Sequence, residues 1–302
     1  MALWIPLTIM AAFLQNLRSA MQKAIKGRLS TTGAAYARFV YALPLAVLYV
    51  WGLEAAGGVR PDPNLTFLVY CTLGGASQIL FTVVLLWMFN FRSFAVGTTF
   101  SKLEVVLIAG LGAVLLGDTV GPIGLVAIGI GALGTMLLAM TEARLTPGAL
   151  LRGMTERVTL VGLLCAMLLG ASSVFYRGAV LALDHPDFVI AAAYTLAVAL
   201  ALQTVMMGAW FVAFDRAELM RVLRHWRQAA PVGAVGMACS VCWFTAFTLQ
   251  NAAYVRALGQ VELLFTFLAS VFFFREKVTG GQIAGILMIV GAILLLLLGE
   301  VA

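Results

Sequence analysis

Charged side chains are scarce in this sequence. Asp, Glu, Lys and Arg together make up 11% of its 302 residues, whereas 63% are hydrophobic. Soluble globular domains carry roughly a quarter charged residues, so the composition excludes a water-soluble domain. The mean hydropathy of +1.03 and the long apolar runs indicate an all-α integral membrane protein that crosses the bilayer several times.

Side chains that bind metals or act as nucleophiles are also rare. The two histidines, His185 and His225, fall in loops on opposite faces and have no clustered acid or cysteine partner. Cys239 and Cys242 form a CxxC pair, but nothing nearby completes a metal site or a redox fold. No GxxxxGK[ST] motif is present, so primary active transport is not encoded. We therefore expect no enzymatic activity, no cofactor and no metal, and we expect all four cysteines to be free, buried thiols.

Two further classes are not supported. The first apolar segment carries Gln15, Asn16 and Arg18 and has no small-residue cleavage site, so no signal peptide is expected. The net charge of +6 invites a nucleic-acid interpretation. The basic residues lie in short loops between apolar segments, however, which the positive-inside rule explains more simply. No nucleic-acid partner is therefore expected.

Ten apolar segments are long enough to cross a membrane as helices, because one span needs about 20 residues. They cover residues 3–23, 31–53, 64–89, 93–116, 119–141, 158–182, 187–213, 229–251, 252–274 and 279–299. The sequence thus predicts a first five-helix repeat over 1–141, a connecting loop over 142–157 and a second five-helix repeat over 158–302. The segment 214–228 is expected to form a short amphipathic helix on the membrane surface.

The two five-helix groups are related by one offset of 158 residues. This offset places Glu104 on Glu262, and Ala34-Ala35-Tyr36 on Ala192-Ala193-Tyr194. One offset that fits separate segments indicates two homologous halves. Because five is an odd number, the second half must enter the membrane from the opposite side. The sequence therefore predicts an inverted repeat with a binding site near the midplane, where the halves meet.

Basic residues gather on one side of this predicted topology. On that side lie Lys23, Lys26, Arg28, Arg92, Arg144, Arg152, Arg157, Arg216, Arg221, Arg224, Arg227, Arg275 and Lys277. The opposite side has only Arg60 and Arg256 as basic loop residues. The positive-inside rule then places both termini outside the cytoplasm, in a multi-pass protein of the inner (plasma) membrane.

Two motifs occur once in each half. An acidic turn precedes a glycine-rich helix at 117–120 and again at 275–279. The third-to-fourth hairpin reads Met-Phe-Asn-Phe at 88–91, and its counterpart reads Ala-Phe-Thr-Leu at 246–249. In this order the motifs resemble the EamA-type ten-helix transporters of the drug/metabolite transporter (DMT) superfamily.

The resemblance covers the whole chain and implies which helices line a cavity and which pack outside it. The first, third, fourth, sixth, eighth and ninth helices would line a central cavity, and the fifth and tenth would pack outside it. The sequence departs from the usual pattern in two respects. A proline common in the fourth and ninth helices is absent, with glutamate in that neighbourhood, and the loop charges run opposite to those of many members.

Glu104 and Glu262 lie near the middle of their predicted helices. An ionisable group inside a span is costly and usually faces a cavity or a partner. Burial raises a carboxyl pKa and a nearby cation lowers it, so this pair suits carrying a proton or holding a cationic substrate. The alternative is a structural ion pair between Glu104 and Lys102. Residues two apart on a helix differ by about 200° in direction, so Lys102 is expected to meet another helix; Gln260 occupies its place in the second half.

Further candidates line the cavity that the resemblance implies. They are Asn16, Arg18, Gln78, Ser173, Tyr176, Arg177 and Trp243. Arg18 and Arg177 are expected to bind an anionic group or to neutralise the two glutamates. The alternative for this set is hydrogen bonding between helices, and for Trp243 a place in the core. Arg38 belongs to the second helix, which is peripheral in the family, and is expected to be structural.

Glycines are dense in the fifth and tenth spans. They are Gly121, Gly124, Gly129, Gly131, Gly134, Gly281 and Gly285. Small residues let helix backbones approach closely in lipid. We interpret them as packing within or between the halves rather than as a dimer interface, so a monomer is favoured over a dimer.

Together these features predict a secondary transporter. It would move a small polar or zwitterionic metabolite, such as an amino acid or an amine, by alternating access, with protons as a candidate coupling ion. The alternative is a flippase or transporter of a lipid-linked or anionic phosphorylated substrate, which Arg18 and Arg177 favour and the two glutamates oppose. A membrane enzyme acting on lipid-linked substrates would need clustered catalytic groups that the sequence lacks. The expected partners are the small-molecule substrate and membrane lipids.

Overall fold

The computed structural model describes residues 2–25, 28–88, 91, 94–146, 148–150, 156–272, 275 and 278–301. Over these ranges the chain forms α-helices joined by turns, with no strand. The helices are α1 (Trp4–Ile25), α2 (Thr31–Val40), α3 (Leu43–Ala55), α4 (Leu65–Met88), α5 (Phe94–Ser101), α6 (Glu104–Leu116), α7 (Pro122–Glu142), α9 (Arg157–Ala182), α10 (Phe188–Phe214), α11 (Arg216–Arg224), α12 (Trp226–Leu249), α13 (Ala252–Gly259), α14 (Val261–Phe272) and α15 (Gly280–Val301). Seven residues used in the charge and motif patterns lie outside the described ranges: Lys26, Phe89, Asn90, Arg92, Arg152, Glu276 and Lys277.

The described part of the chain contains eight helices long and apolar enough to cross a membrane, or nine if the bent pair α5–α6 is one span. They correspond to nine of the ten predicted segments. The remaining segment, 3–23, is present as the helix α1 but is not among these spans. Its polar run of Gln15, Asn16 and Arg18 interrupts the apolar sequence. The protein is therefore an all-helical, multi-pass membrane protein.

The helix predicted over 214–228 is confirmed as α11. Its N-cap is Asp215, whose Oδ1 accepts a hydrogen bond from the Glu218 amide at 3.0 Å. Glu218 and Val222 are buried on one face of the helix, while Leu223 and Arg224 on the other side are exposed. One face of α11 thus packs against the rest of unit 1, and the other face is exposed.

The described helices form two compact units, and each unit takes residues from both halves of the sequence. Unit 1 comprises 1–79 and 175–250, and unit 2 comprises 80–174 and 251–302. The helices α4 and α9 each contribute one part to each unit. The two compact units therefore do not coincide with the two halves that the sequence offset predicts.

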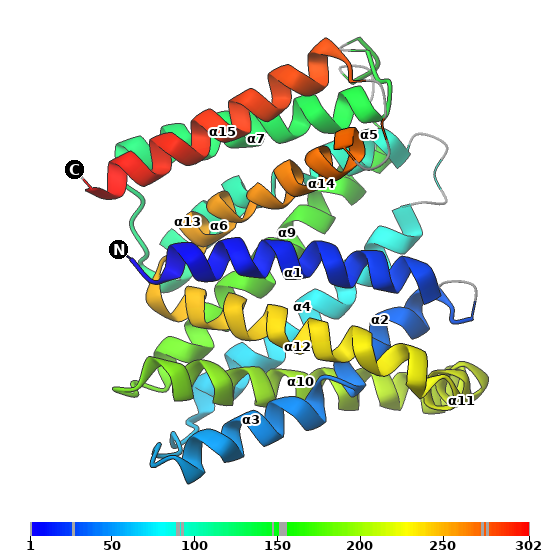
Figure 1. Ribbon diagram of the computed structural model, residues 1–302, viewed down its shortest axis with the longest axis vertical. Helices are drawn as coiled ribbons and strands as arrows, with labels where there is room; N and C mark the ends of the chain where they lie inside the picture. The colour runs from blue at the N-terminus through cyan, green and yellow to red at the C-terminus, as the bar shows by residue number, and fades with distance from the viewer. Residues whose placement is uncertain are drawn as a thin grey trace. The chain divides into compact units, whose positions relative to one another are not determined.

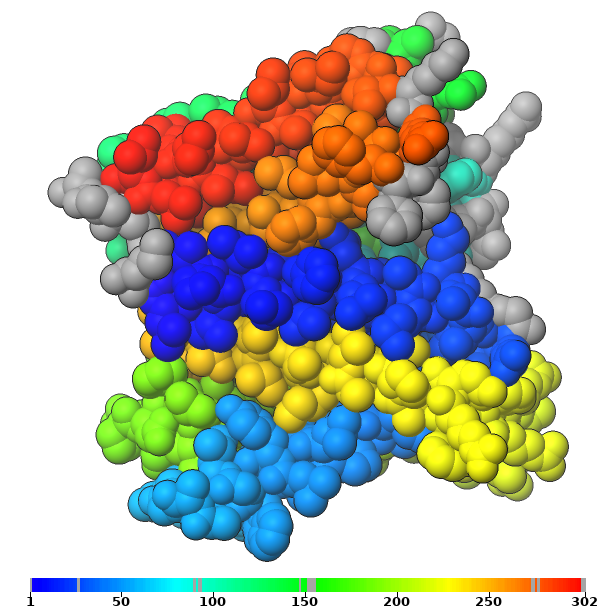
Figure 2. Space-filling view, in the orientation of Figure 1, coloured from blue at the N-terminus to red at the C-terminus, as the bar shows by residue number. Residues whose placement is uncertain are grey.

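In unit 1, α1 lies along α12 (Figure 1), and their side chains meet on the face shown in Figure 2. The contact is close enough for the Cys239 thiol of α12 to donate to the Ala11 carbonyl of α1 at 3.3 Å. The aromatic rings of Tyr36 on α2 and Phe211 on α10 are 5.3 Å apart in the core of this unit. The four cysteines are free, as predicted, although Cys242 is half-buried.

In unit 2, α7 and α15 run side by side (Figure 1) and approach closely at two glycines. A Cβ atom added to Gly134 would lie 3.0 Å from the Gly285 carbonyl oxygen, and one added to Gly285 would lie 3.0 Å from the Gly134 carbonyl oxygen. Only residues without a side chain allow the two backbones to lie this close. The packing interpretation of the glycines is confirmed at these two positions, whereas Gly129 has no neighbour within 4 Å for such an atom to meet.

Candidate functional site

The predicted fourth span is broken beside its acidic residue. The helix α5 ends at Ser101, and a tight turn follows in which the Lys102 and Leu103 amides donate to the Thr99 and Phe100 carbonyls, both at 3.2 Å. The chain then resumes as α6, which is bent by 44° from α5. The argument that Lys102 and Glu104 face apart assumed a continuous helix, so it does not hold here. Both residues line the same pocket.

The predicted ninth span is broken at the corresponding place. The helix α13 ends at Gly259 and α14 begins at Val261, with the Gln260 amide donating to the Ala257 carbonyl at 3.2 Å. The two breaks, at Lys102 and Gln260, are 158 residues apart, which is the offset that relates the two halves.

Glu104 and Glu262 each lie in the first turn of the helix after a break. Both acids therefore lie near the middle of their spans, as predicted, but each span is interrupted just before its acid, and only the first is bent by more than 40° there. At a helix N-terminus the partial positive charge of the backbone stabilises a carboxylate. The start of a helix just before each acid thus provides backbone N–H groups whose partial positive charge stabilises a carboxylate inside the span.

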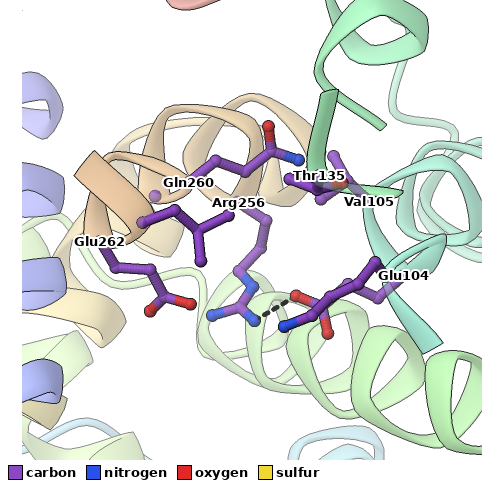
Figure 3. Close-up of a pocket in the computed structure, with 9 residues that line it drawn as sticks. Glu104, Val105, Thr135, Arg256, Gln260 and Glu262 are labelled. Atoms are coloured by element: carbon purple, nitrogen blue, oxygen red, sulfur yellow. Dashed lines mark hydrogen bonds and ion pairs between the residues drawn. The ribbon is translucent and has the colours of Figure 1, made fainter. Parts of the chain in front are cut away.

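One small pocket in unit 2 collects these residues (Figure 3). It is lined by Lys102, Glu104, Val105, Thr135, Arg256, Gly259, Gln260, Glu262 and Leu263. The volume of this cavity is about 30 Å³. A water molecule needs about 10–15 Å³ by this measure, so the pocket holds about two waters. The structure therefore brings four of the predicted site residues together.

Arg256 is the residue of this pocket that sequence reasoning missed. It had been counted with the outer loops, but it lies on α13 with 13% of its side chain exposed. Its Nη2 donates to Glu104 Oε1 at 2.5 Å, and the Glu104 side chain is 18% exposed. The sequence could have indicated Arg256 as a site residue, because it lies inside the predicted span 252–274, and an arginine in a membrane span needs a partner or a cavity just as a glutamate does.

The pocket is electrically balanced, with Lys102 and Arg256 opposite Glu104 and Glu262. Figure 3 shows the Arg256 guanidinium pointing into the space between the two carboxylates. The Lys102 ammonium makes no hydrogen bond or ion pair with any described residue. An added cation or proton in this pocket would therefore compete with Arg256 for carboxylate oxygen.

Gln260 takes part through its amide. It is 8% exposed, and its Oε1 would lie 2.6 Å from a Cβ added to Gly131 of α7. Gly131 thus makes room for this side chain, and Thr135 lies one helical turn further along the same wall of the pocket. Through this contact α7 supports the second break.

The candidates on α1 and α12 meet each other. Trp243 is 7% exposed, and its Nε1 donates to Gln15 Oε1 at 3.2 Å. Its ring stacks on that of Phe247 with centroids 5.7 Å apart. These contacts fit the core alternative for Trp243. Asn16 is half-buried on the same helix as Gln15.

Three other candidates hydrogen-bond within the protein or pack in its interior. Gln78 on α4 accepts at Oε1 from Gln203 Nε2 at 2.7 Å. The Ser173 hydroxyl donates to the Leu169 carbonyl of its own helix at 3.4 Å. Tyr176 is buried, and its ring centroid lies 4.8 Å from that of Phe244.

The two candidate arginines differ in their surroundings. Arg177 donates from Nη1 to the Phe247 and Gln250 carbonyls, both at 2.6 Å. These carbonyls lie at the C-terminus of α12, where helices leave acceptors unsatisfied and a cation is stabilising. Arg18, on α1, is half-buried and makes no hydrogen bond to a described residue. For Arg177 the interhelical alternative is therefore supported.

Comparison with known proteins agrees with the helical architecture. A solved structure described as a crystal structure of a protein superposes with a TM-score of 0.69, covering 98% of this chain and 97% of the other at 16% identity. At this identity the likeness establishes the fold alone. No curated protein matches the chain. Residues 157–298 match the model of the EamA-like transporter family. Residues 157–298 are thus similar to the EamA-like transporter family, the family of the DMT superfamily that the motifs indicated.

Proposed function

We propose that this protein is a secondary transporter of a small polar or zwitterionic solute, such as an amino acid or an amine, and that it works by alternating access. The family consists of membrane transporters of small solutes. The observation that carries the finer proposal is the charged pocket at the two helix breaks, where Arg256 binds Glu104 and faces Glu262.

Broken helices are a recurring device of secondary transporters, because the ends of half-helices bind substrates and coupling ions in the bilayer. Here both breaks present an acid, and one cation already occupies the space between them. A proton or the ammonium group of a solute would displace Arg256 from a carboxylate. The pocket holds about two waters, so we propose that it takes the coupling proton or one amino group rather than a whole solute.

The proposal includes a membrane topology with ten spans. The α1 helix would be the tenth span, since its polar residues are covered in part by α12. The two homologous halves would be inverted with respect to each other. Both termini would lie outside the cytoplasm, in the inner membrane, with the protein acting as a monomer.

The test is a ligand screen on the purified protein followed by uptake into liposomes. Amino acids, amines, nucleosides and phosphorylated metabolites are added in turn, and thermal unfolding is followed, because a ligand that binds the folded state raises the melting temperature with its concentration. The variants are Glu104→Gln and Glu262→Gln. The control is Glu54→Gln, an acid outside the pocket that pairs with the exposed Arg60.

We expect an amine or amino acid to stabilise the wild type and the control, and both pocket variants to lose the response. Liposome uptake of that compound should depend on the pH gradient and should lose this dependence in the pocket variants. Uptake that ignores pH in the wild type and in both variants would refute proton coupling. A response only to anionic or lipid-linked compounds, unchanged in the variants, would favour the alternative of a flippase or phosphorylated-metabolite transporter.

A further inference from the structure

Two arginines of unit 1 converge on one glycine of α12. A Cβ atom added to Gly236 would lie 3.4 Å from Cδ of Arg18 on α1 and 3.9 Å from Cβ of Arg38 on α2. The side chains therefore start from different helices and flank the same small residue. The charge of Arg18 also acts on Arg38 as a repulsion. Two like charges are thus held together in the interior of this unit.

Neither guanidinium is neutralised by the protein. Within the described residues, Arg18 and Arg38 make no hydrogen bond and no ion pair, and the Nε atom of each is buried without a partner. The guanidinium carbon of Arg38 lies 4.4 Å from the centre of the Phe39 ring. That contact covers one flat face of the group and leaves its N–H edge to bind something else.

A third unsatisfied donor lies close to them. Tyr176 on α9 is 3% exposed, and its hydroxyl has no partner among the described residues. Tyr176 belongs to the same core cluster as Ala37 and Phe39, the two neighbours of Arg38 on α2. Three separate helices thus each direct a polar group, without a partner of its own, at one region of unit 1.

This arrangement is costly unless something negative is bound. A charged group that has lost part of its hydration without gaining a counter-ion destabilises the folded protein. Two glutamates of unit 1 are paired with other arginines: Glu54 binds Arg60, and Glu218 binds Arg221. Guanidinium groups form paired, parallel hydrogen bonds with the two oxygens of a carboxylate or phosphate.

We propose that Arg18 and Arg38, with the hydroxyl of Tyr176, form a binding site for an oxyanion, the carboxylate or phosphate group of a ligand. Gly236 keeps the space between the two arginines free of a side chain. The site lies within unit 1 and is separate from the pocket at the helix breaks. Binding of an oxyanion at this site does not require transport, so the binding proposal could hold even if the proposed transport activity were refuted.

The experiment uses the purified full chain in phosphatidylcholine nanodiscs. Sodium acetate and sodium phosphate are the probes, with sodium chloride at the same ionic strength as the reference. We expect at least one oxyanion to raise the melting temperature with its concentration beyond the effect of chloride. Arg18→Gln and Arg38→Gln should each weaken this response at least tenfold in concentration, whereas Arg60→Gln, whose arginine is exposed, should leave it unchanged.

Folding of the variants is checked in the same experiment. Without added anion, Arg38→Gln should melt at the same temperature as the wild type or higher, because it removes an unneutralised buried charge. Tyr176→Phe removes only a hydroxyl and should weaken the response several-fold. Arginine variants that respond like the wild type, or a wild-type response no larger than that to chloride, would overturn the proposal.

A second nanodisc preparation distinguishes a free solute from a lipid. Phosphatidylglycerol replaces part of the phosphatidylcholine, and no free oxyanion is added. Stabilisation that both arginine variants lose would support the site and assign the phosphate group to a lipid. Stabilisation by this lipid alone, retained in both variants, with no response to acetate or phosphate, would refute the site.

Discussion

The Oε1 atom of Glu104 lies 2.5 Å from Nη2 of Arg256, although 152 residues separate the two in the sequence. The contact joins α6 to α13, and both side chains are largely buried. Removing one member of a buried pair leaves the other charge without compensation. This contact therefore contributes to stability as well as to the proposed coupling site.

Glu104→Gln and Arg256→Gln should each destabilise the protein, by about 3 kcal/mol if the pair behaves as other buried pairs do. The double variant should cost less than the two single changes together, with a coupling energy on the order of 1–3 kcal/mol. Unfolding of all four proteins in one detergent measures the cycle. The pair of Glu54 and Arg60 serves as its control and should show less coupling, because the Arg60 side chain is 63% exposed to solvent. Additive effects at Glu104 and Arg256 would mean that they do not act as a pair.

Alanine at two glycines of α7 should have opposite effects. At Gly134 the new Cβ would lie 2.9 Å from Met288 Cβ and 3.0 Å from the Gly285 carbonyl oxygen, so α7 and α15 must separate, at a cost of about 1–3 kcal/mol. At Gly129 no atom lies within 4 Å, and alanine should gain up to about 1 kcal/mol of helix propensity. Melting temperatures of Gly134→Ala and Gly129→Ala test this. Equal shifts in both variants would contradict the close approach at Gly134.

Glu218 attaches α11 to the start of α2. Its Oε1 accepts from the Ser30 amide at 2.7 Å, its Oε2 accepts from Arg221 at 2.7 Å, and the residue is 1% exposed. Glu218→Gln keeps one acceptor but loses the ion pair, so we expect a loss of about 1–3 kcal/mol. Hydrogen exchange of the amides near Ser30 should accelerate at the same time.

Arg224→Gln is the matched control for this prediction. Arg224 lies in the last turn of the same short helix but is exposed. Surface substitutions away from packed features usually change stability by less than about 0.5 kcal/mol. If Glu218→Gln and Arg224→Gln were equally mild, Glu218 would not anchor the helix.

Helix positions were predictable because the hydrophobic run that a membrane requires is a local property of the sequence. The segment 158–182 reappears as α9, which begins one residue earlier and ends at the same residue, and 187–213 reappears as α10, with both ends one residue later. The short helix α11 was predictable for the same reason, since its charged residues interrupt two apolar runs. The first segment, 3–23, formed a helix, but its polar residues keep its composition from identifying it as a span.

The sequence also singled out Glu104 and Glu262, because a carboxylate in an apolar run is conspicuous and both acids obey one offset. It did not reveal the breaks before them. No proline marks either interruption, and the single glycine beside the second one, Gly259, did not distinguish it from the many other glycines of this chain.

By itself, then, the sequence determined a helical membrane protein, the limits of most of its helices and the acids to be examined. The tertiary structure alone decided that α6 begins at Glu104 and α14 one residue before Glu262, that Arg256 pairs with Glu104, and that Arg18 and Arg38 flank Gly236. Hydrophobicity and helix propensity act between near neighbours in the chain and can be read from it. The partner of a buried charge is set by which helices pack together, often more than a hundred residues apart, and one sequence without that packing does not specify it.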